Sequence, residues 1–313
     1  MLKKLYYKLY VIAVFCVLIM MFLIHMKNHS MHKSRPTASN VINSICHPLP
    51  LPAITEENEE IELKSYTQSF WGTVAIQPVP LFVINTHDPI QQDKFISGAI
   101  HAGTVWDPFV WDLFVRVLAN QPTKQLVVDV GANLGYFSLM AASLGHRVVA
   151  FEPMQRNAVK FLSSIQANHF EMLIHLHRQA VWFDSKSSVV LQPTHSTNQG
   201  NGQIVGLGKK ANTVRLDELL NEPILLLKID VEGFEGAVLD GAYKLLSRGL
   251  IQNIVIECSD HTKNNLMCPF QSLLKLMKGF GYIMSDITPN AKLIHDNKNL
   301  PPNLLFSFQP LKR

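Results

Sequence analysis

The most informative stretch of the chain is Leu126-Val-Val-Asp-Val-Gly-Ala-Asn-Leu-Gly-Tyr-Phe137. Its first five residues are apolar except for Asp129, and such a run predicts a strand covered on both faces of a sheet. Gly131 and Gly135 then allow a tight turn and a close approach to a ligand, because no Cβ stands in the way. The stretch therefore predicts a strand that leads through a ligand-binding turn into a helix.

A second predicted strand extends this interpretation. Arg147-Val-Val-Ala-Phe151 follows after a segment of helical length and ends in Glu152-Pro153. An acid at the end of the second strand of a β–α–β unit is placed to accept hydrogen bonds from ribose hydroxyls. The two strands together predict a site for a nucleoside-containing cofactor, with Glu152 at the ribose.

The spacing of the glycines narrows the choice of cofactor. A dinucleotide site needs G-x-G-x-x-G at this turn, but Asn133 stands where the second glycine would be, which disfavours an NAD-dependent oxidoreductase. No phosphate-binding P-loop occurs either. The remaining common ligand of such a turn is S-adenosylmethionine. Its carboxylate would meet the amides between Gly131 and Gly135, and its ammonium would meet Asp129.

From about residue 80 onward, apolar runs of strand length alternate with amphipathic helical patterns, which predicts an α/β fold with a largely parallel sheet. The glycine-rich segment 199–210 is predicted to be a surface loop. Strands are predicted near 126–130, 147–151, 173–181, 187–192, 224–229, 252–257, 280–284 and 303–309. Helices are predicted near 107–119, 135–144, 154–168, 234–247 and 269–279.

An ordered set of motifs resembles that of FkbM-type methyltransferases. The set comprises Val128-Asp-Val-Gly-Ala-Asn-Leu-Gly-Tyr-Phe137, Ala150-Phe-Glu-Pro153 with Asn157, Thr213-Val-Arg-Leu-Asp-Glu-Leu-Leu220, Leu227-Lys-Ile-Asp-Val-Glu-Gly-Phe-Glu-Gly236, Val238-Leu-Asp-Gly-Ala242 and Ile254-Val-Ile-Glu257. The resemblance covers roughly residues 85–285. It implies a Rossmann-like class I methyltransferase fold with a mostly parallel, doubly wound sheet, and S-adenosylmethionine-dependent O-methylation. Because the family acts on varied hydroxyls, the acceptor does not follow from the resemblance.

The segment Lys228-Ile-Asp-Val-Glu-Gly-Phe-Glu235 leaves a buried strand at the sheet edge where ligands of open α/β folds bind. We expect Asp230 to take the proton of the acceptor hydroxyl or to position the acceptor, with Glu232 and His261 as further catalytic candidates. The two acids could also cap the following helix. No third ligand is identifiable nearby, so we assign no metal, although paired carboxylates suit a divalent cation. The expected cofactor-binding residues are Asp129, Gly131, Asn133, Gly135, Glu152, Asn157, Gln179 and Ala180.

The N-terminus predicts a membrane anchor. Leu9 to Ile24 is an unbroken apolar run of 16 residues, which as a helix would be about 24 Å long. A cleaved signal peptide is the alternative, but no small-x-small cleavage pattern follows Met26. The lysines of the short tail predict a cytoplasmic N-terminus and a luminal body. We therefore predict a cytoplasmic tail (1–8), a signal-anchor helix (9–26), a stem (27–75) and an FkbM-like methyltransferase domain (76–313).

The charge distribution and the predicted membrane topology limit the possible functions. Residues 1–35 hold six of the 28 basic residues and no acid, so the remainder has 22 basic and 24 acidic residues, a net charge of −2 that does not support nucleic-acid binding. Luminal acceptors are largely sugars and secreted proteins, so we expect methylation of a glycan or similar hydroxyl in the ER or Golgi. The alternative is a non-catalytic binding or scaffold protein. The sequence does not decide whether Cys258 and Cys268 form a disulfide or are two buried free thiols. It also does not determine the oligomeric state.

Overall fold

The computed structural model describes residues 68–309 except 122–123, 196–197, 208–210, 259–269 and 295–299. The predicted tail and anchor, most of the predicted stem, His261 and Cys268 lie outside the described residues. Within the described part of the chain, no helix combines the length and the apolar character that crossing a membrane requires.

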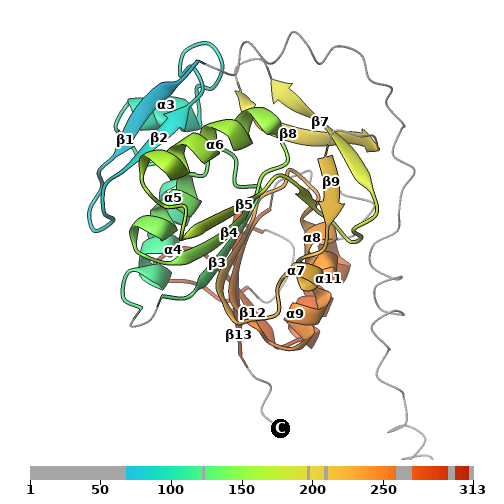
Figure 1. Ribbon diagram of the computed structural model, residues 1–313. Helices are drawn as coiled ribbons and strands as arrows, with labels where there is room; N and C mark the ends of the chain where they lie inside the picture. Colours follow the sequence, from blue (N-terminus) through green and yellow to red (C-terminus); the bar gives the residue numbers. More distant parts are fainter. Residues whose placement is uncertain are drawn as a thin grey trace, which may run out of the picture. The chain divides into compact units, whose positions relative to one another are not determined.

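A seven-stranded sheet forms the centre of the fold (Figure 1), in the order β12-β13-β11-β10-β3-β4-β5. Its members are β3 (Leu126–Val130), β4 (Arg147–Phe151), β5 (Ile174–His177), β10 (Ile224–Ile229), β11 (Ile251–Glu257), β12 (Tyr282–Asp286) and β13 (Asn303–Phe308). Only β13 runs against its neighbours β11 and β12, which confirms the predicted, mostly parallel sheet. The chain order reverses between β3 and β10, and ligands of open α/β sheets bind in the crevice at such a point.

Helices cover the two faces of this sheet, as a doubly wound fold requires (Figure 1). On one side lie α4 (Pro108–Leu118), α5 (Tyr136–Ser143) and α6 (Gln155–Ala167); on the other lie α8 (Glu235–Gly241), α9 (Tyr243–Ser247) and α11 (Phe270–Gly279). The short α7 (Leu216–Leu219) contacts α8 and α9. The single helix predicted over 234–247 is wrong, because the backbone leaves helical geometry at Ala242 (φ −104°, ψ 7°).

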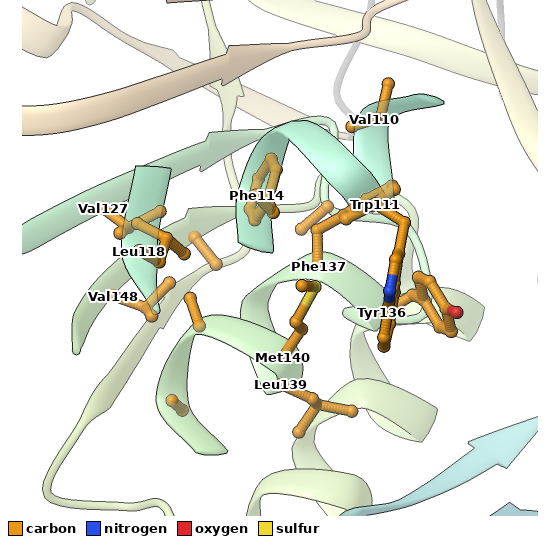
Figure 2. Packing of buried hydrophobic residues seen from close by; sticks show 14 of the residues in the cluster. Val110, Trp111, Phe114, Leu118, Val127, Tyr136, Phe137, Leu139, Met140 and Val148 are labelled. Carbon is orange, nitrogen blue, oxygen red and sulfur yellow. The ribbon is translucent and has the colours of Figure 1, made fainter. Parts of the chain in front are cut away.

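The core between α4, α5 and the sheet is aromatic (Figure 2). The rings of Phe114 and Phe137 pack with centroids 4.8 Å apart, and those of Trp111 and Tyr136 with centroids 5.5 Å apart. All five residues of β3 are buried, as predicted for a strand covered on both faces. The strand that carries the ligand-binding turn is thus held between packed layers and positions the turn rigidly.

An N-terminal hairpin, which sequence patterns did not predict, precedes the sheet. It consists of β1 (Phe70–Val74) and β2 (Phe82–Thr86), paired antiparallel, and is followed by α3 (Ile96–His101). Polar contacts fix β2 on α6: the amide of Asn85 donates to Ser164 Oγ (2.8 Å), and the amide of Val83 donates to Asn168 Oδ1 (2.8 Å). Because β1 lies within 27–75, the folded domain includes residues that we assigned to the stem.

A second sheet has the order β6-β9-β7-β8, with β6 (Ala180–Val181), β7 (Ser188–His195), β8 (Asn198–Leu207) and β9 (Ala211–Val214). The prediction of a surface loop over 199–210 is wrong for residues up to 207, because they form β8 and pair with β7. The strand predicted over 173–181 is divided between β5 and β6, which belong to different sheets. A Cβ on Gly202 would overlap the sulfur of Met154, so β8 packs closely on the residue that precedes α6.

Candidate active site

A cavity of about 290 Å³ lies at the carboxyl ends of β3, β4, β10 and β11. The cavity also has an apolar wall that was not predicted from the sequence. Phe95 and Ile96 of the N-terminal region and Leu191 and Ile204 of the second sheet form this wall. Of the predicted site residues, those that line the cavity are Gly131, Asn133, Glu152, Asn157, Gln179, Ala180, Asp230 and Glu232. The structure therefore brings six of the eight predicted cofactor residues, together with the predicted acids Asp230 and Glu232, to one space.

The two glycines of the turn have a packing role in addition to the one expected. Both adopt left-handed backbone conformations, with φ of 79° at Gly131 and 84° at Gly135. A Cβ on Gly131 would overlap the backbone oxygen of Asp230, and one on Gly135 would overlap the ring of Phe161. The glycines thus let the turn pack against β10 and α6. Gly135 and the 1% exposed Asp129 are not among the residues that line the cavity.

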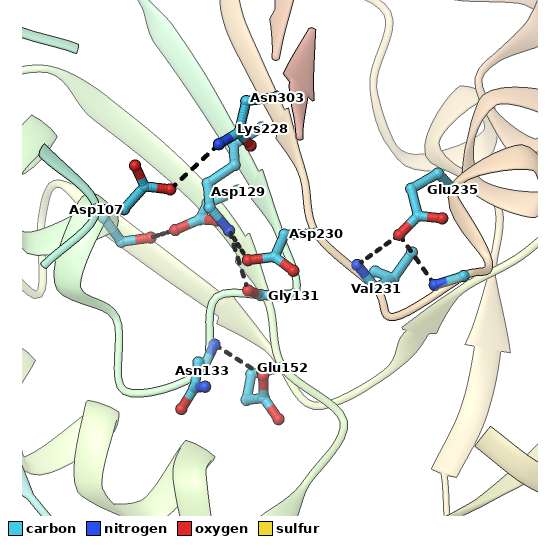
Figure 3. Close-up of polar contacts among 12 residues, drawn as sticks. Asp107, Asp129, Gly131, Asn133, Glu152, Lys228, Asp230, Val231, Glu235 and Asn303 are labelled. Carbon is cyan, nitrogen blue, oxygen red and sulfur yellow. Dashed lines mark hydrogen bonds and ion pairs between the residues drawn. The ribbon is translucent and has the colours of Figure 1, made fainter. Parts of the chain in front are cut away.

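One end of the cavity, here called the ribose end, is built around Glu152, which is 4% exposed. Its Oε2 accepts a hydrogen bond from the amide of Asn133 (2.8 Å; Figure 3), while Oε1 accepts from the amide of Met154 (2.9 Å) and from Asn157 Nδ2 (3.3 Å). Burial raises the pKa of Glu152 to about 7, although the hydrogen bonds oppose this rise. A carboxylate has about four acceptor positions, so these three donors leave room for a further one.

The residues of the ribose end fit a nucleoside. Asn133 Oδ1 is buried and has no hydrogen-bond partner among the described residues, and Asn133 lines the cavity. An unpaired buried acceptor is costly, and a ligand hydroxyl or ammonium would satisfy it. Gln179, Ala180 and Val181 line the same cavity at the start of the second sheet, and the first two are among the expected cofactor-binding residues. Glu152 and Asn133 are accordingly the residues that would hold the ribose and neighbouring polar groups of S-adenosylmethionine.

At the other end of the cavity lies an acid cluster of Asp230, Glu232 and Glu257, whose nearest carboxylate oxygens all lie within 4.8 Å of one another. Such a set could hold a divalent cation, and Glu257 is the third oxygen ligand that sequence reasoning did not identify. It follows the last apolar residue of β11, just as Asp230 follows that of β10. Because Ile229 is paired with Ile256 in the parallel register, the two acids meet. Their equivalent places at two strand ends were the only sequence signal for the pair.

Lys228 compensates part of the negative charge (Figure 3). Its Nζ lies 3.2 Å from Asp230 Oδ2, 3.5 Å from Asp129 Oδ1 and 3.3 Å from the backbone oxygen of Gly131. Burial alone would lower the pKa of Lys228, but the carboxylates of Asp230 and Asp129 raise it above its usual value. Lys228 is thus a buried ammonium that links Asp230 to the glycine turn.

Asp230 and Glu257 differ in their protonation states. The charge of Asp230, followed by burial, raises the pKa of Glu257 to about 10. Burial would also raise the pKa of Asp230, but Lys228 and a hydrogen bond with Glu257 keep it below its usual value. At neutral pH the pair is therefore a neutral Glu257 that donates a hydrogen bond to an ionised Asp230.

The loop that carries Glu232 is held by hydrogen bonds to the buried side chain of Glu235. Glu232 has a left-handed backbone with φ of 53°, which costs a residue with a Cβ about 1–2 kcal/mol. Glu235, 1% exposed, accepts hydrogen bonds at Oε1 from the amides of Val231 (3.2 Å) and Gly233 (3.1 Å; Figure 3). These bonds hold the strained loop in place, so Glu235 has a structural role.

The acid end is also reached by the N-terminal region. Asn303, which is paired opposite Glu257 in the sheet, donates to Asp107 Oδ2 (3.4 Å; Figure 3). This contact holds the Trp106–Asp107 segment beside the acid cluster. Trp106 lines the cavity, and its ring meets that of the half-exposed Phe95 edge-on, with centroids 6.4 Å apart. The N-terminal region therefore supplies aromatic surface next to the acids.

Comparison with known proteins identifies the central part of the chain. Residues 129–284, which include Glu152 and the whole acid cluster, match the family described as "Methyltransferase FkbM domain". No curated protein sequence matches the chain significantly.

Several solved structures are similar to the chain. One is a methyltransferase FkbM from Methylobacillus flagellatus KT (18% identity, 59% of this chain and 44% of that chain, TM-score 0.38). Another is an rRNA methylase from Streptococcus thermophilus (16% identity, 63% of this chain and 93% of that chain, TM-score 0.37). A third is precorrin-6y C5,15-methyltransferase from Geobacter metallireducens GS-15 (13% identity, 66% of this chain and 90% of that chain, TM-score 0.38). The chain spans less than half the length of the first of these proteins.

Proposed function

We propose that this chain, whose residues 129–284 form an FkbM-type methyltransferase domain, is an S-adenosylmethionine-dependent O-methyltransferase of a glycan or a similar hydroxyl-bearing acceptor. The observation that carries the proposal is a single cavity with a ribose end at Glu152 and an acid cluster at the opposite end. When bound, S-adenosylmethionine supplies an electrophilic methyl group whose transfer to an acceptor oxygen leaves the bonding electron pair on sulfur.

In the proposed reaction Asp230 receives the proton of the acceptor hydroxyl. Its pKa is held low by Lys228, so it is a weak base at rest. A weak base suffices, because the hydroxyl proton becomes strongly acidic only as the oxygen gains its methyl group. Glu257 stabilises the ionised Asp230 by donating a hydrogen bond, and Lys228 fixes the orientation of the Asp230 carboxylate. Glu232 also lines the cavity and can accept a hydrogen bond from a second hydroxyl of the substrate to be methylated.

The character of the acid end supports a neutral sugar as the acceptor. The ionised Asp230 repels phosphate and carboxylate groups, and the carboxyl oxygens of the acid cluster accept hydrogen bonds from hydroxyls. Phe95 and Trp106 add apolar ring surface to the same cavity. A neutral, polyhydroxylated ring with one apolar face matches both features. An anionic acceptor matches neither.

The cellular setting is part of the proposal. The apolar run Leu9–Ile24 and the lysines of the tail support a single-pass protein of the ER or Golgi with a luminal catalytic domain. Protease treatment of sealed microsomes from cells that express a C-terminally tagged chain tests this topology. Protection of the tag that is lost with detergent is expected; digestion without detergent would contradict the luminal assignment.

Activity is tested with the full-length protein in two steps. Calorimetry should first detect binding of S-adenosylhomocysteine; no binding would favour a non-catalytic protein that retains the fold. Labelled S-adenosylmethionine is then incubated with the protein and a cell extract divided into glycan, protein, lipid and RNA fractions. Label in the glycan fraction that is lost with Asp230→Asn is expected. Label in another fraction would refute the glycan assignment. Mass spectrometry of glycans from cells with and without the gene should then show a difference of one methyl group.

A further inference from the structure

His87 lies directly after β2, outside the part of the chain that matches the methyltransferase family, and is 2% exposed. Its Nε2 lies 2.9 Å from Oδ1 of Asn157. The same Asn157 side chain donates from Nδ2 to Oε1 of Glu152 (3.3 Å). His87 is thereby joined, through one buried amide, to the carboxylate at the ribose end.

The hydrogen bonds of Glu152 show which way the Asn157 amide is oriented. Its carboxylate accepts from the backbone amides of Asn133 and Met154, so Asn157 turns its NH₂ group toward it. The Asn157 Oδ1 atom then faces His87 and can only accept, so His87 carries its proton on Nε2. Burial lowers the pKa of His87 to about 4, so the ring is a neutral donor at physiological pH.

Three hydrogen bonds hold the end of β2, and with it His87, in place. The amide of Asn85 donates to Ser164 Oγ on α6, and the backbone amide and carbonyl of Val83 bind the side chain of Asn168, the residue that follows α6, at 2.6–2.8 Å. Asn157 belongs to the same helix. The donor and the acceptor of the His87–Asn157 bond are therefore carried by two elements that are fixed to each other, which gives the bond a defined geometry.

We infer that His87 is a positioning residue for the ribose of the cofactor. It prevents the Asn157 amide from rotating, keeps the amide NH₂ on Oε1 of Glu152, and so leaves Oε2 turned toward the ribose hydroxyls. Without His87, Asn157 can turn its oxygen to the carboxylate, and two acceptors would then repel each other. The inference rests on the proposed function and adds to the site a residue from the N-terminal hairpin.

The test measures two ligands with full-length variants. Calorimetry gives dissociation constants for S-adenosylhomocysteine and for its 2′,3′-dideoxyribose analogue, which lacks the groups that Glu152 would bind. His87→Leu should weaken S-adenosylhomocysteine binding roughly 5- to 20-fold, the value of one buried hydrogen bond. The dideoxy analogue should bind His87→Leu as tightly as it binds the wild-type protein. His87→Gln, which keeps a donor, should stay within about twofold of wild type for both ligands.

His101→Leu is the matched control, because His101 contacts Thr86 Oγ1 (3.0 Å) on the same hairpin. It should change neither constant. If His87→Leu does not fold, Asn157→Asp gives the same comparison, since aspartate accepts from His87 but cannot donate to Glu152. With an acceptor in hand, KM for the donor should rise in His87→Leu while kcat at saturating donor is kept.

The outcomes separate the inference from the proposed function. Failure of the wild-type protein to bind S-adenosylhomocysteine overturns the proposed function. Normal wild-type binding, together with an equal loss for both ligands in His87→Leu, overturns the inference, because a purely structural role would not distinguish the riboses. A loss for S-adenosylhomocysteine alone supports it.

Discussion

The two ends of the cavity each place a carboxylate at the end of a parallel strand, yet the two groups are held in opposite ways. Glu152 is surrounded by neutral donors, two backbone amides and Asn157. Asp230 is held by the Lys228 ammonium and by a protonated Glu257. Burial therefore prevails at Glu152 and raises its pKa to about 7, whereas charge prevails at Asp230 and lowers its pKa. Neighbours, and not residue type or strand position, distinguish the carboxylate that we propose for ligand binding from the one that we propose for proton transfer.

The largest effect is expected at the acid end. Asp230→Asn should lower kcat roughly 10²- to 10⁴-fold, because it removes the proton acceptor. Binding of S-adenosylhomocysteine should change less than about threefold, since we propose that the ribose end holds the nucleoside. Labelled methyl transfer and calorimetry measure the two quantities. Asp112→Asn, at a partly exposed site paired with Arg116 on α4, is the matched control. An unchanged kcat in Asp230→Asn would break the division of roles.

The converse change at the ribose end should be the next largest. Glu152→Gln places an NH₂ group against one of the amides that now donate to Glu152, and it weakens the acceptor for the ribose. We expect about a 10- to 100-fold loss in affinity for S-adenosylhomocysteine, with a smaller change in kcat at saturating donor. Calorimetry and donor-dependent kinetics give both values. A fall in kcat with an unchanged donor KM would assign Glu152 to chemistry instead of binding.

The protonated Glu257 predicts a pH-dependent stability. Its pKa is raised to about 10 in the folded chain, against about 4.3 for an unfolded glutamate. Below the unfolded value both states hold the proton. As pH rises above it, only the unfolded state releases the proton, so the folded state loses stability progressively until about pH 10. Glu257→Gln avoids this loss, and its gain in Tm over wild type should be larger at pH 8 than at pH 5.

The same measurement can be sharpened with Asp230→Asn as the background. Because the charge of Asp230 is the largest cause of the raised pKa, the pH-dependent gain from Glu257→Gln should shrink when Asp230 is already neutral. A gain that is equally large in both backgrounds would mean that burial alone raises the pKa of Glu257.

The smallest expected effect concerns backbone strain, which is present at both ends. Asn133 and Glu232 each have φ of 53°, but asparagine tolerates this conformation better than glutamate. Glu232→Gly should therefore increase the free energy of unfolding by up to about 1 kcal/mol, and Asn133→Gly should increase it less. Denaturant unfolding of the two variants provides the comparison. Equal changes would contradict the strain argument.

Strands buried on both faces were predictable from sequence to within a residue. β3, β4 and β10 consist almost entirely of apolar residues and end in polar or glycine positions, so pattern and structure coincide. β8 was missed because its glycines, asparagines and glutamines have low strand propensity; pairing with β7 makes it a strand. The hairpin of β1 and β2 was missed because Gly72 and the buried polar residues Asn85 and Thr86 interrupt the apolar pattern of the two strands.

The features of the site also separate into those that local sequence predicts and those that depend on contacts between distant residues. The sequence by itself determined the strand–turn–helix at 126–137, the acid that ends β4 and the acid that ends β10, because each depends on residues close together in the chain. Only the tertiary structure decided that the two glycines face Asp230 and Phe161. It also decided that Glu257 shares a proton with Asp230 and that His87 reaches Asn157. Protonation and packing depend on the groups that parallel strand register and helix packing bring within a few ångströms, and no local pattern contains those distances.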